Sequence, residues 1–143
     1  MCCFAADNSL DIVAVSETWL VPSVPSSFIT IAGYSVVRGD TDGFFRKHGV
    51  CLYIREGLLF EEVNVVGANL AAVHLRKFNL WMLSVYRPPS YGDHDNEVLL
   101  QTIRDFCIGR EVVLLGDFNL PSVIWSAGCG MCNFVAGRST RAD

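Results

Sequence analysis

The sequence is short of charged residues, and its basic residues are fewer than its acidic ones. Charged residues make up 18% of the 143 residues, and 11 Lys and Arg stand against 15 Asp and Glu, for a formal net charge of -4. This balance argues against a protein that grips nucleic acid through a broad basic surface. It does not exclude a nuclease, because the carboxylates that hold a divalent cation are themselves negative.

Long apolar runs and targeting segments are also missing. No run approaches the roughly 18 apolar residues that a membrane span requires. Residues 1–7 carry neither a basic stretch nor an apolar stretch of signal-peptide length. Without a secretory signal, the six cysteines are expected to be reduced thiols rather than a disulfide framework. The sequence thus predicts a soluble intracellular protein that does not contact a membrane.

What the sequence does have is a large apolar fraction, 51% of residues, in a length that suits one domain. Short β-branched runs between turn signals predict strands at residues 11–16, 31–38, 49–55, 58–66, 70–75, 80–86 and 111–116. The first and last of these runs are continuously apolar, the pattern of a strand buried on both faces. One helix is predicted, capped by Asp93 or Asp95 and ending at Gly109.

The spacing of these elements predicts the fold class. Closely spaced strands favour antiparallel meanders, and many strands with few helices favour an α/β sandwich of two sheets packed face to face. Residues 1–125 are predicted to form this domain. The pattern deteriorates beyond Trp125, so residues 126–143 are predicted to be a divergent tail without clear structure.

Two of the predicted buried strands end in a carboxylate, Glu17 after the first and Asp117 after the last. A rigid hydrophobic strand holds the polar residue at its exit at the lip of the sheet. Gly116 lets an ion or substrate approach the backbone there, and Asn119 presents its amide on the same side if the chain stays extended. Taken singly, either carboxylate is equally well explained as an ordinary surface residue at a strand end.

A third strand ends in Tyr86 and Arg87. A phenol, a guanidinium, two carboxylates and an amide at three strand exits suit phosphoryl chemistry. The carboxylates would bind Mg²⁺, and the Arg and Tyr side chains would bind phosphate.

Three segments in order resemble signatures of the endonuclease/exonuclease/phosphatase family. They are residues 16–20 (SETWL), 84–89 (SVYRPP) and 115–121 (LGDFNLP). The branch that they resemble most is the apurinic-type endonuclease domain of LINE-type (non-LTR) retrotransposons. In that branch an intervening segment also matches Gly33, Tyr34, Arg38, Gly49 and residues 52–54. The resemblance runs from about Asp11 to Trp125 and implies a four-layered α/β sandwich of the DNase I-like type, incomplete at both ends.

The resemblance also implies roles for the residues at the strand exits. Glu17 would coordinate Mg²⁺ or Mn²⁺, with Asp117 as a further metal-site carboxylate. Asp117 would orient or deprotonate the attacking water, and Tyr86 would contact the scissile phosphate or its neighbour. Asn119 would bond to the phosphate as charge builds in the transition state.

Arg87 would lie beside Tyr86 at the substrate phosphate, and Arg38 is a weaker candidate for contact with a DNA phosphate. In the complete parent domain the partner would be DNA, the location would be the nucleus if the parent is active, and a reverse transcriptase could be fused in the same polypeptide. The resemblance implies no specific protein partner.

The sequence departs from the family pattern in two places. The family's first strand brings an Asn to the metal site, and the lone candidate here, Asn8, is too close to the strand at 11–16. The family's later Ser-Asp-His segment has no match after Asp117. His48, His74 and His94 all precede it, and each is expected to be an ordinary polar residue rather than the missing base. We therefore expect the chain to be catalytically incomplete on its own.

A cysteine pair, two basic pairs and three tryptophans are expected to have no role in catalysis. Cys129 and Cys132 form a C-x-x-C pair, but no second pair or paired His accompanies it to complete a zinc site, so a metal or redox role is the minor alternative. Two basic pairs are expected to be solvated charges in loops, and contact with DNA phosphate is the minority alternative. These pairs are Arg46 with Lys47 and Arg76 with Lys77. The tryptophans are expected to be core residues: Trp19, Trp81 and Trp125.

Three hypotheses about function follow. The first is a Mg²⁺-dependent DNA-nicking endonuclease domain of a retroelement, and the residues of the motifs at 84–89 and 115–121 favour it. The second is another phosphoesterase of the same superfamily, acting on lipid, nucleotide or RNA. The third is a non-catalytic retroelement relic that at most binds a partner or nucleic acid.

Overall fold

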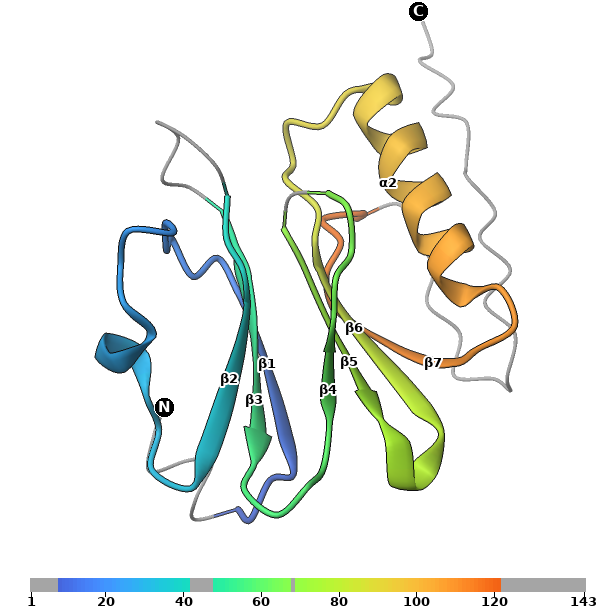
Figure 1. The fold of residues 1–143 in the computed structure, drawn as a ribbon. Helices are drawn as coiled ribbons and strands as arrows, with labels where there is room; N and C mark the ends of the chain where they lie inside the picture. The colour runs from blue at the N-terminus through green and yellow to red at the C-terminus, as the bar shows by residue number, and fades with distance from the viewer. Residues whose placement is uncertain (1–7, 42–47, 68, 122–143) are drawn as a thin grey trace, which may run out of the picture.

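Two β-sheets pack face to face, with one helix on the outside (Figure 1), in a computed structural model that describes residues 8–41, 48–67 and 69–121. The first sheet has the order β1 (Ile12–Ser16), β3 (Val50–Arg55), β2 (Tyr34–Gly39), and all of its pairs are antiparallel. The second sheet has the order β4 (Glu61–Val63), β5 (Leu70–Leu75), β6 (Leu80–Tyr86), β7 (Glu111–Asp117). The sequence prediction of a two-sheet α/β sandwich is confirmed.

The second sheet combines the predicted meander with one crossover. Strands β4, β5 and β6 form an antiparallel meander, and β5 and β6 are joined by the short 3-10 turn η2 (Arg76–Phe78). Strand β7 pairs in parallel with β6, and helix α2 (Asp93–Cys107) makes the connection between them. A parallel pair needs such a crossover, because a tight turn can only reverse the chain.

Side chains alternate between the layers, as a sheet with two covered faces requires. The inner faces of the two sheets meet in one cluster around Leu52, Ile54 and Val73. The outer face of the second sheet packs Leu83 and Val85 against α2. The outer face of the first sheet is covered by the segment that holds the 3-10 turn η1 (Ser26–Ile29), where the Tyr53 hydroxyl donates to the Ile29 carbonyl at 2.8 Å.

The boundaries of two predicted elements need correction. Only Glu61–Val63 of the predicted strand at 58–66 pairs with β5. Helix α2 is capped by Gly92 rather than by Asp93 or Asp95, although the Asp95 carboxylate accepts a hydrogen bond from the Gly92 N–H at 3.2 Å. That bond satisfies a backbone donor at the helix start, which is the function expected of a capping side chain.

The prediction that the first and last strands are buried on both faces is confirmed only in part: both faces of β1 and of β7 pack against apolar clusters, but the burial is incomplete. Along β1 and the middle of β7 the residues are only partly buried. In the described part of the chain each of these strands lies at the end of its sheet and pairs on one side only, so solvent reaches them from the other side. A continuous apolar run does not distinguish a central strand from such a position.

Some sequence interpretations lie outside the described residues, namely those for the tail 126–143, Cys129, Cys132, Trp125, Arg46 and Lys47. Within the described residues, no helix combines the length and the apolar character needed to cross a membrane.

Candidate functional site

Glu17 and Tyr86 meet at the end of the sandwich where β1 and β6 terminate. The Tyr86 hydroxyl donates to Glu17 Oε1 at 2.6 Å, across 69 residues of sequence and from one sheet to the other. This length is typical of an O–H donor on a carboxylate. Tyr86 is 3% exposed, whereas Glu17 is exposed. The pair therefore presents a carboxylate to solvent on a buried, rigid support.

A change of backbone conformation turns Glu17 toward Tyr86. In regular alternation Glu17 would share the outer face of the first sheet with Val13 and Val15. Instead its φ is 55°, in the left-handed region, and Trp19 follows at 56°. Such conformations cost non-glycine residues on the order of 1–3 kcal/mol each and persist only where the surroundings hold them.

Backbone hydrogen bonds from the start of β3 hold this turn. The Thr18 N–H donates to the Gly49 carbonyl at 3.2 Å, and the Trp19 N–H donates to the His48 carbonyl at 2.9 Å. Gly49 itself has φ 98°, and a Cβ there would lie 2.6 Å from Thr18 Oγ1. The turn after β1 therefore depends on a glycine at the start of β3.

Asp117 and Asn119 lie beside Tyr86, because the parallel register pairs Tyr86 with Asp117. The chain does not stay extended after Asp117. Asn119 has φ 46°, its N–H donates to Asp117 Oδ1 at 3.0 Å, and its Nδ2 donates to the Arg87 carbonyl at 2.9 Å. This turn directs the Asn119 amide back toward the end of β6. The structure thus brings together Glu17, Tyr86, Asp117 and Asn119.

The pKa of Tyr86 reflects this gathering of charge. Its pKa is raised to about 12, chiefly by burial, then by the hydrogen bond to Glu17 and by the negative charges of Glu17 and Asp117. A hydrogen bond with Asn119 acts in the opposite direction. At neutral pH the group is a phenol that donates a hydrogen bond, and it suits contact with an anionic oxygen better than proton abstraction.

A hollow of about 710 Å³ adjoins the cluster, lined by Asp117, Asn119 and their neighbours from Leu114 to Pro121. Gly116 stands at its edge, with φ 142° and with its Cα so close to β6 that a Cβ would lie 1.8 Å from the Val85 carbonyl oxygen. The glycine is therefore needed for β7 to approach β6, in addition to the open approach to Asp117 expected from the sequence.

Arg87 is held by the protein itself. Its Nε donates to Asn96 Oδ1 on α2 at 2.7 Å, its Nη1 to the Asn119 carbonyl at 3.1 Å, and its Nη2 to the Tyr91 carbonyl at 3.4 Å. These bonds join α2 to the turn that carries Asn119. The guanidinium thus acts as an internal support in this structure, and its contact with a substrate phosphate stays a prediction.

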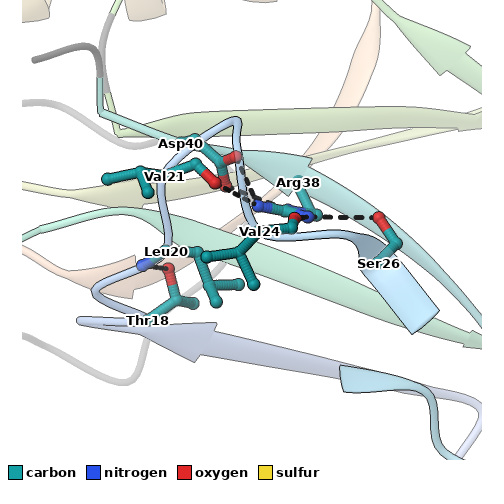
Figure 2. Close-up of polar contacts among 7 residues, drawn as sticks. All are labelled: Thr18, Leu20, Val21, Val24, Ser26, Arg38 and Asp40. Atoms are coloured by element: carbon teal, nitrogen blue, oxygen red, sulfur yellow. Dashed lines mark hydrogen bonds and ion pairs between the residues drawn. The ribbon is translucent and has the colours of Figure 1, made fainter. Parts of the chain in front are cut away.

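Arg38 is engaged more completely (Figure 2). Its Nε and Nη2 form a bidentate pair with Asp40 at 3.0 and 2.6 Å. Its remaining N–H groups reach the Val21 and Val24 carbonyls and Ser26 Oγ, at 3.0, 2.6 and 3.2 Å. All five guanidinium N–H groups are thus used, and none remains for the DNA phosphate expected from the sequence. Arg38 instead holds the loop after the Glu17 turn against β2.

The histidines are partly as expected. His74 stacks on Trp81, with ring centroids 4.1 Å apart, and His94 is exposed near the start of α2. His48, however, lies against Tyr86 with ring centroids 5.5 Å apart, and its Nδ1 is buried without a partner among the described residues. Its position in a loop gave no sequence signal for this proximity.

The expectation that Trp19 belongs to the core is wrong, because its side chain is 59% exposed. The left-handed turn that directs Glu17 toward Tyr86 leaves the Trp19 side chain in solvent. Trp81 is partly buried and meets the Phe106 ring edge-on at 6.0 Å, as expected for a core residue.

Metal binding here would rely on oxygen ligands. Within the described ranges, no group of three or more His, Cys, Asp or Glu side chains gathers as a metal cage. Mg²⁺ does not need one, since it binds through one or two carboxylates and completes its shell with water and substrate phosphate. The exposed Glu17 and Asp117 carboxylates are donors of that kind.

No protein-family model matches the chain, and no curated protein sequence matches it. Solved structures do match. An AP endonuclease from Archaeoglobus fulgidus superposes with a TM-score of 0.59 at 17% identity, over 84% of this chain and 51% of that one. TDP2 from D. rerio in complex with a single-strand DNA product has a TM-score of 0.52 at 20% identity, over 83% and 52%. The human Nocturnin catalytic domain has a TM-score of 0.51 at 14% identity, over 81% and 54%.

The chain spans about half the length of these structural relatives. At such low identity the similarity concerns the fold. Together with the two facing sheets and the α2 crossover, it shows that this chain has the DNase I-like α/β-sandwich fold of these structures.

Proposed function

We propose that the chain is part of a Mg²⁺-dependent phosphodiesterase domain that resembles the target-DNA-nicking endonuclease of a LINE-type retroelement. The observation that carries the proposal is the Glu17–Tyr86 hydrogen bond at 2.6 Å, with Asp117 and Asn119 beside it. Three motifs far apart in the sequence supply these four residues, and they meet at one end of the sandwich.

Each of the four side chains has a place in phosphodiester hydrolysis. Glu17 binds the metal ion, Tyr86 donates a hydrogen bond to a phosphate oxygen, and Asp117 orients or deprotonates the attacking water. Asn119 donates to the phosphate as negative charge builds. Mg²⁺ or Mn²⁺, when bound, supplies positive charge that polarises the phosphate.

The proposal includes weak metal binding and little activity for this chain alone. The family's remaining metal ligand and its catalytic histidine come from segments with no counterpart in this sequence. Members of a catalytic unit act together, so the loss of one can remove most of the rate enhancement. The complete parent would act on DNA in the nucleus, with a reverse transcriptase as a possible neighbour in the same polypeptide.

The test of function is the nicking of supercoiled plasmid in the presence of Mg²⁺, by this chain and by a version extended at both ends. We expect the extended version to nick, Asp117→Ala to abolish nicking, and this chain to be far slower. The control is Glu111→Ala, which removes an exposed carboxylate at the opposite end of β7. Equal rates for the short and extended chains would show that the missing segments are not essential.

The metal assignment is tested by calorimetric titration of this chain with Mg²⁺ or Mn²⁺. We expect loose binding that is lost in Glu17→Ala and kept in Glu111→Ala. Tight binding that survives Glu17→Ala would place the metal elsewhere.

The alternatives predict different outcomes in the same assays. Another phosphoesterase of this superfamily would leave plasmid intact but hydrolyse a nucleotide, RNA or lipid phosphoester in an Asp117-dependent way. A non-catalytic relic would hydrolyse none of them, even when extended at both ends.

A further inference from the structure

Asn69 is a buried polar residue at the catalytic end of the sandwich, next to none of the sequence motifs. Its side chain is 2% exposed, and among the described residues only Asn69 and Ser84 are both polar and buried. Burying an amide is unfavourable unless its hydrogen bonds are made. The partners of Asn69 therefore indicate what it does.

Those partners belong to both sheets. Asn69 Oδ1 accepts from the Gly49 N–H at 2.8 Å and from Thr41 Oγ1 at 2.9 Å, both in the connection between β2 and β3. The Asn69 carbonyl accepts from the Tyr86 N–H at 3.0 Å, at the end of β6 in the other sheet. One residue thus bonds to the first sheet through its side chain and to the second through its backbone.

The contact with Gly49 leads on to the Glu17 turn. The Gly49 carbonyl accepts from the N–H of Thr18, the residue after Glu17. A chain of three hydrogen bonds therefore runs from the Tyr86 backbone through Asn69 and Gly49 to the turn that carries the Glu17 carboxylate. The Tyr86 hydroxyl closes the loop by donating to that carboxylate at 2.6 Å.

The two sheets also touch through their backbones at this point. A Cβ on Gly39, at the end of β2, would lie 2.0 Å from the carbonyl oxygen of Leu70, the residue after Asn69. Elsewhere the sheets meet through apolar side chains, whose attraction has no preferred direction. The bonds of Asn69 are directional, so they can fix the offset between the sheets to within a fraction of an ångström.

We propose that Asn69 is a positioning residue of the site, which sets Glu17 against Tyr86 by bonding to both sheets at once. Its importance for catalysis rests on the proposed function, but its effect on the Glu17–Tyr86 geometry does not.

The backbone conformation of Asn69 makes a clean set of variants possible. Its φ is 62°, a left-handed conformation that Gly, Asn and Asp adopt more readily than other residues. Asn69→Gly keeps the backbone and removes the side-chain acceptor. Asn69→Asp keeps an acceptor for both donors. Thr41→Val removes one donor and leaves the bond to Gly49, so it is the matched control.

The measurement is the contact between Tyr86 and Glu17 in this chain without metal, followed by NMR. It is observed as nuclear Overhauser effects between the Tyr86 ring and the Glu17 side chain, together with amide hydrogen exchange at Thr18 and Tyr86. In Asn69→Gly we expect the Overhauser effects to weaken and the exchange to accelerate, because the bond from Gly49 to Asn69 Oδ1 is lost. In Thr41→Val both should stay as in the wild type, because that bond is kept.

Each outcome decides the proposal. A folded Asn69→Gly with an unchanged Tyr86–Glu17 contact and unchanged exchange overturns it. If Asn69→Gly does not fold, Asn69→Asp is measured at pH 5, where a carboxyl buried at this position stays largely protonated and keeps a carbonyl acceptor. A retained Tyr86–Glu17 contact in that variant supports the proposal, and a lost contact overturns it. A weakened contact in Asn69→Gly together with failure of the extended protein in the plasmid assay would keep the positioning role and reject the nuclease.

Discussion

Replacing Arg38 with Met separates the role that the structure gives this residue from the role that the sequence motif implied. Met preserves much of the aliphatic volume and removes all five N–H donors. The structure predicts a loss of folding stability, because Asp40 is left largely buried without its partner and the Val21 and Val24 carbonyls lose their donors. A phosphate contact would instead predict normal stability and weaker DNA binding.

The size of the loss follows from burial. The side chains of Arg38 and Asp40 are 12% and 13% exposed, and removing one partner of a buried pair costs about 3–5 kcal/mol. Some relaxation toward solvent is possible at the loop, so we expect about 3 kcal/mol. The double variant Arg38→Met with Asp40→Asn should recover part of this loss, since the remaining amide is cheaper to bury than a carboxylate.

The assay is urea unfolding of this chain, followed by circular dichroism. The matched control is Arg55→Met, which breaks the exposed Arg55–Asp11 pair in the same sheet, with side chains 45% and 61% exposed. An exposed pair contributes on the order of 0–1 kcal/mol, so this control should change little. The reasoning is refuted if Arg38→Met is as stable as Arg55→Met. It is also refuted if, in the extended protein, Arg38→Met reduces the salt dependence of DNA binding by about one phosphate contact.

Three further predictions test other parts of the structure. The free energy of unfolding should fall as pH rises above about 9. Burial raises the pKa of the Cys51 thiol from 9.0 to about 11 and that of Tyr86 from 10.0 to about 12. The unfolded chain therefore loses these protons at lower pH than the folded chain does. Urea unfolding between pH 8 and 11 checks this, and in Cys51→Ala the fall should be smaller. Gly116→Ala should lower stability by roughly 3 kcal/mol or more through left-handed strain and overlap with β6. Gly109→Ala has open space around it and should cost only about 1–2 kcal/mol, from the left-handed conformation alone. Equal melting temperatures for the two variants would contradict this. Tyr86→Phe should reduce nicking by the extended protein by about 100-fold or more, as for the loss of one transition-state donor, and an unchanged rate would remove the phenol from the mechanism.

Much of the fold could be predicted from the sequence, since β3, β5 and β6 are short apolar runs between turn signals, and they are the well-buried strands of the structure. The exposure of β1 and β7 could not, because it depends on neighbouring strands rather than on the residues within each strand. The cap of α2 lies one residue before Asp93 and three before Asp95, the two positions that the sequence favours. Gly92 takes the cap position, and the Asp95 side chain reaches back to it.

The membership of the site could be predicted, but the geometry of several of its residues could not. Glu17 and Asp117 stand at strand exits that the sequence marks plainly. The left-handed turns at Glu17 and Asn119 are not marked by glycine, so nothing in the sequence shows that alternation breaks there. The resemblance implies phosphate contacts for Arg38 and Arg87, but it does not indicate the internal partners that the structure gives them, among them Asp40 for Arg38 and Asn96 for Arg87. Asn69 gave no signal, because its role depends on the docking of two sheets.

The hydrogen bond between Glu17 and Tyr86 has a consequence for the order in which the chain folds. Its two ends are 69 residues apart, whereas β5 and β6 are joined by a short turn and can pair early. Closing long loops costs chain entropy before any contact repays it, so distant pairings form late. The cluster of Glu17, Tyr86, Asp117 and Asn119 should therefore assemble in the last kinetic phase of refolding, so a nascent or partly folded chain would lack it.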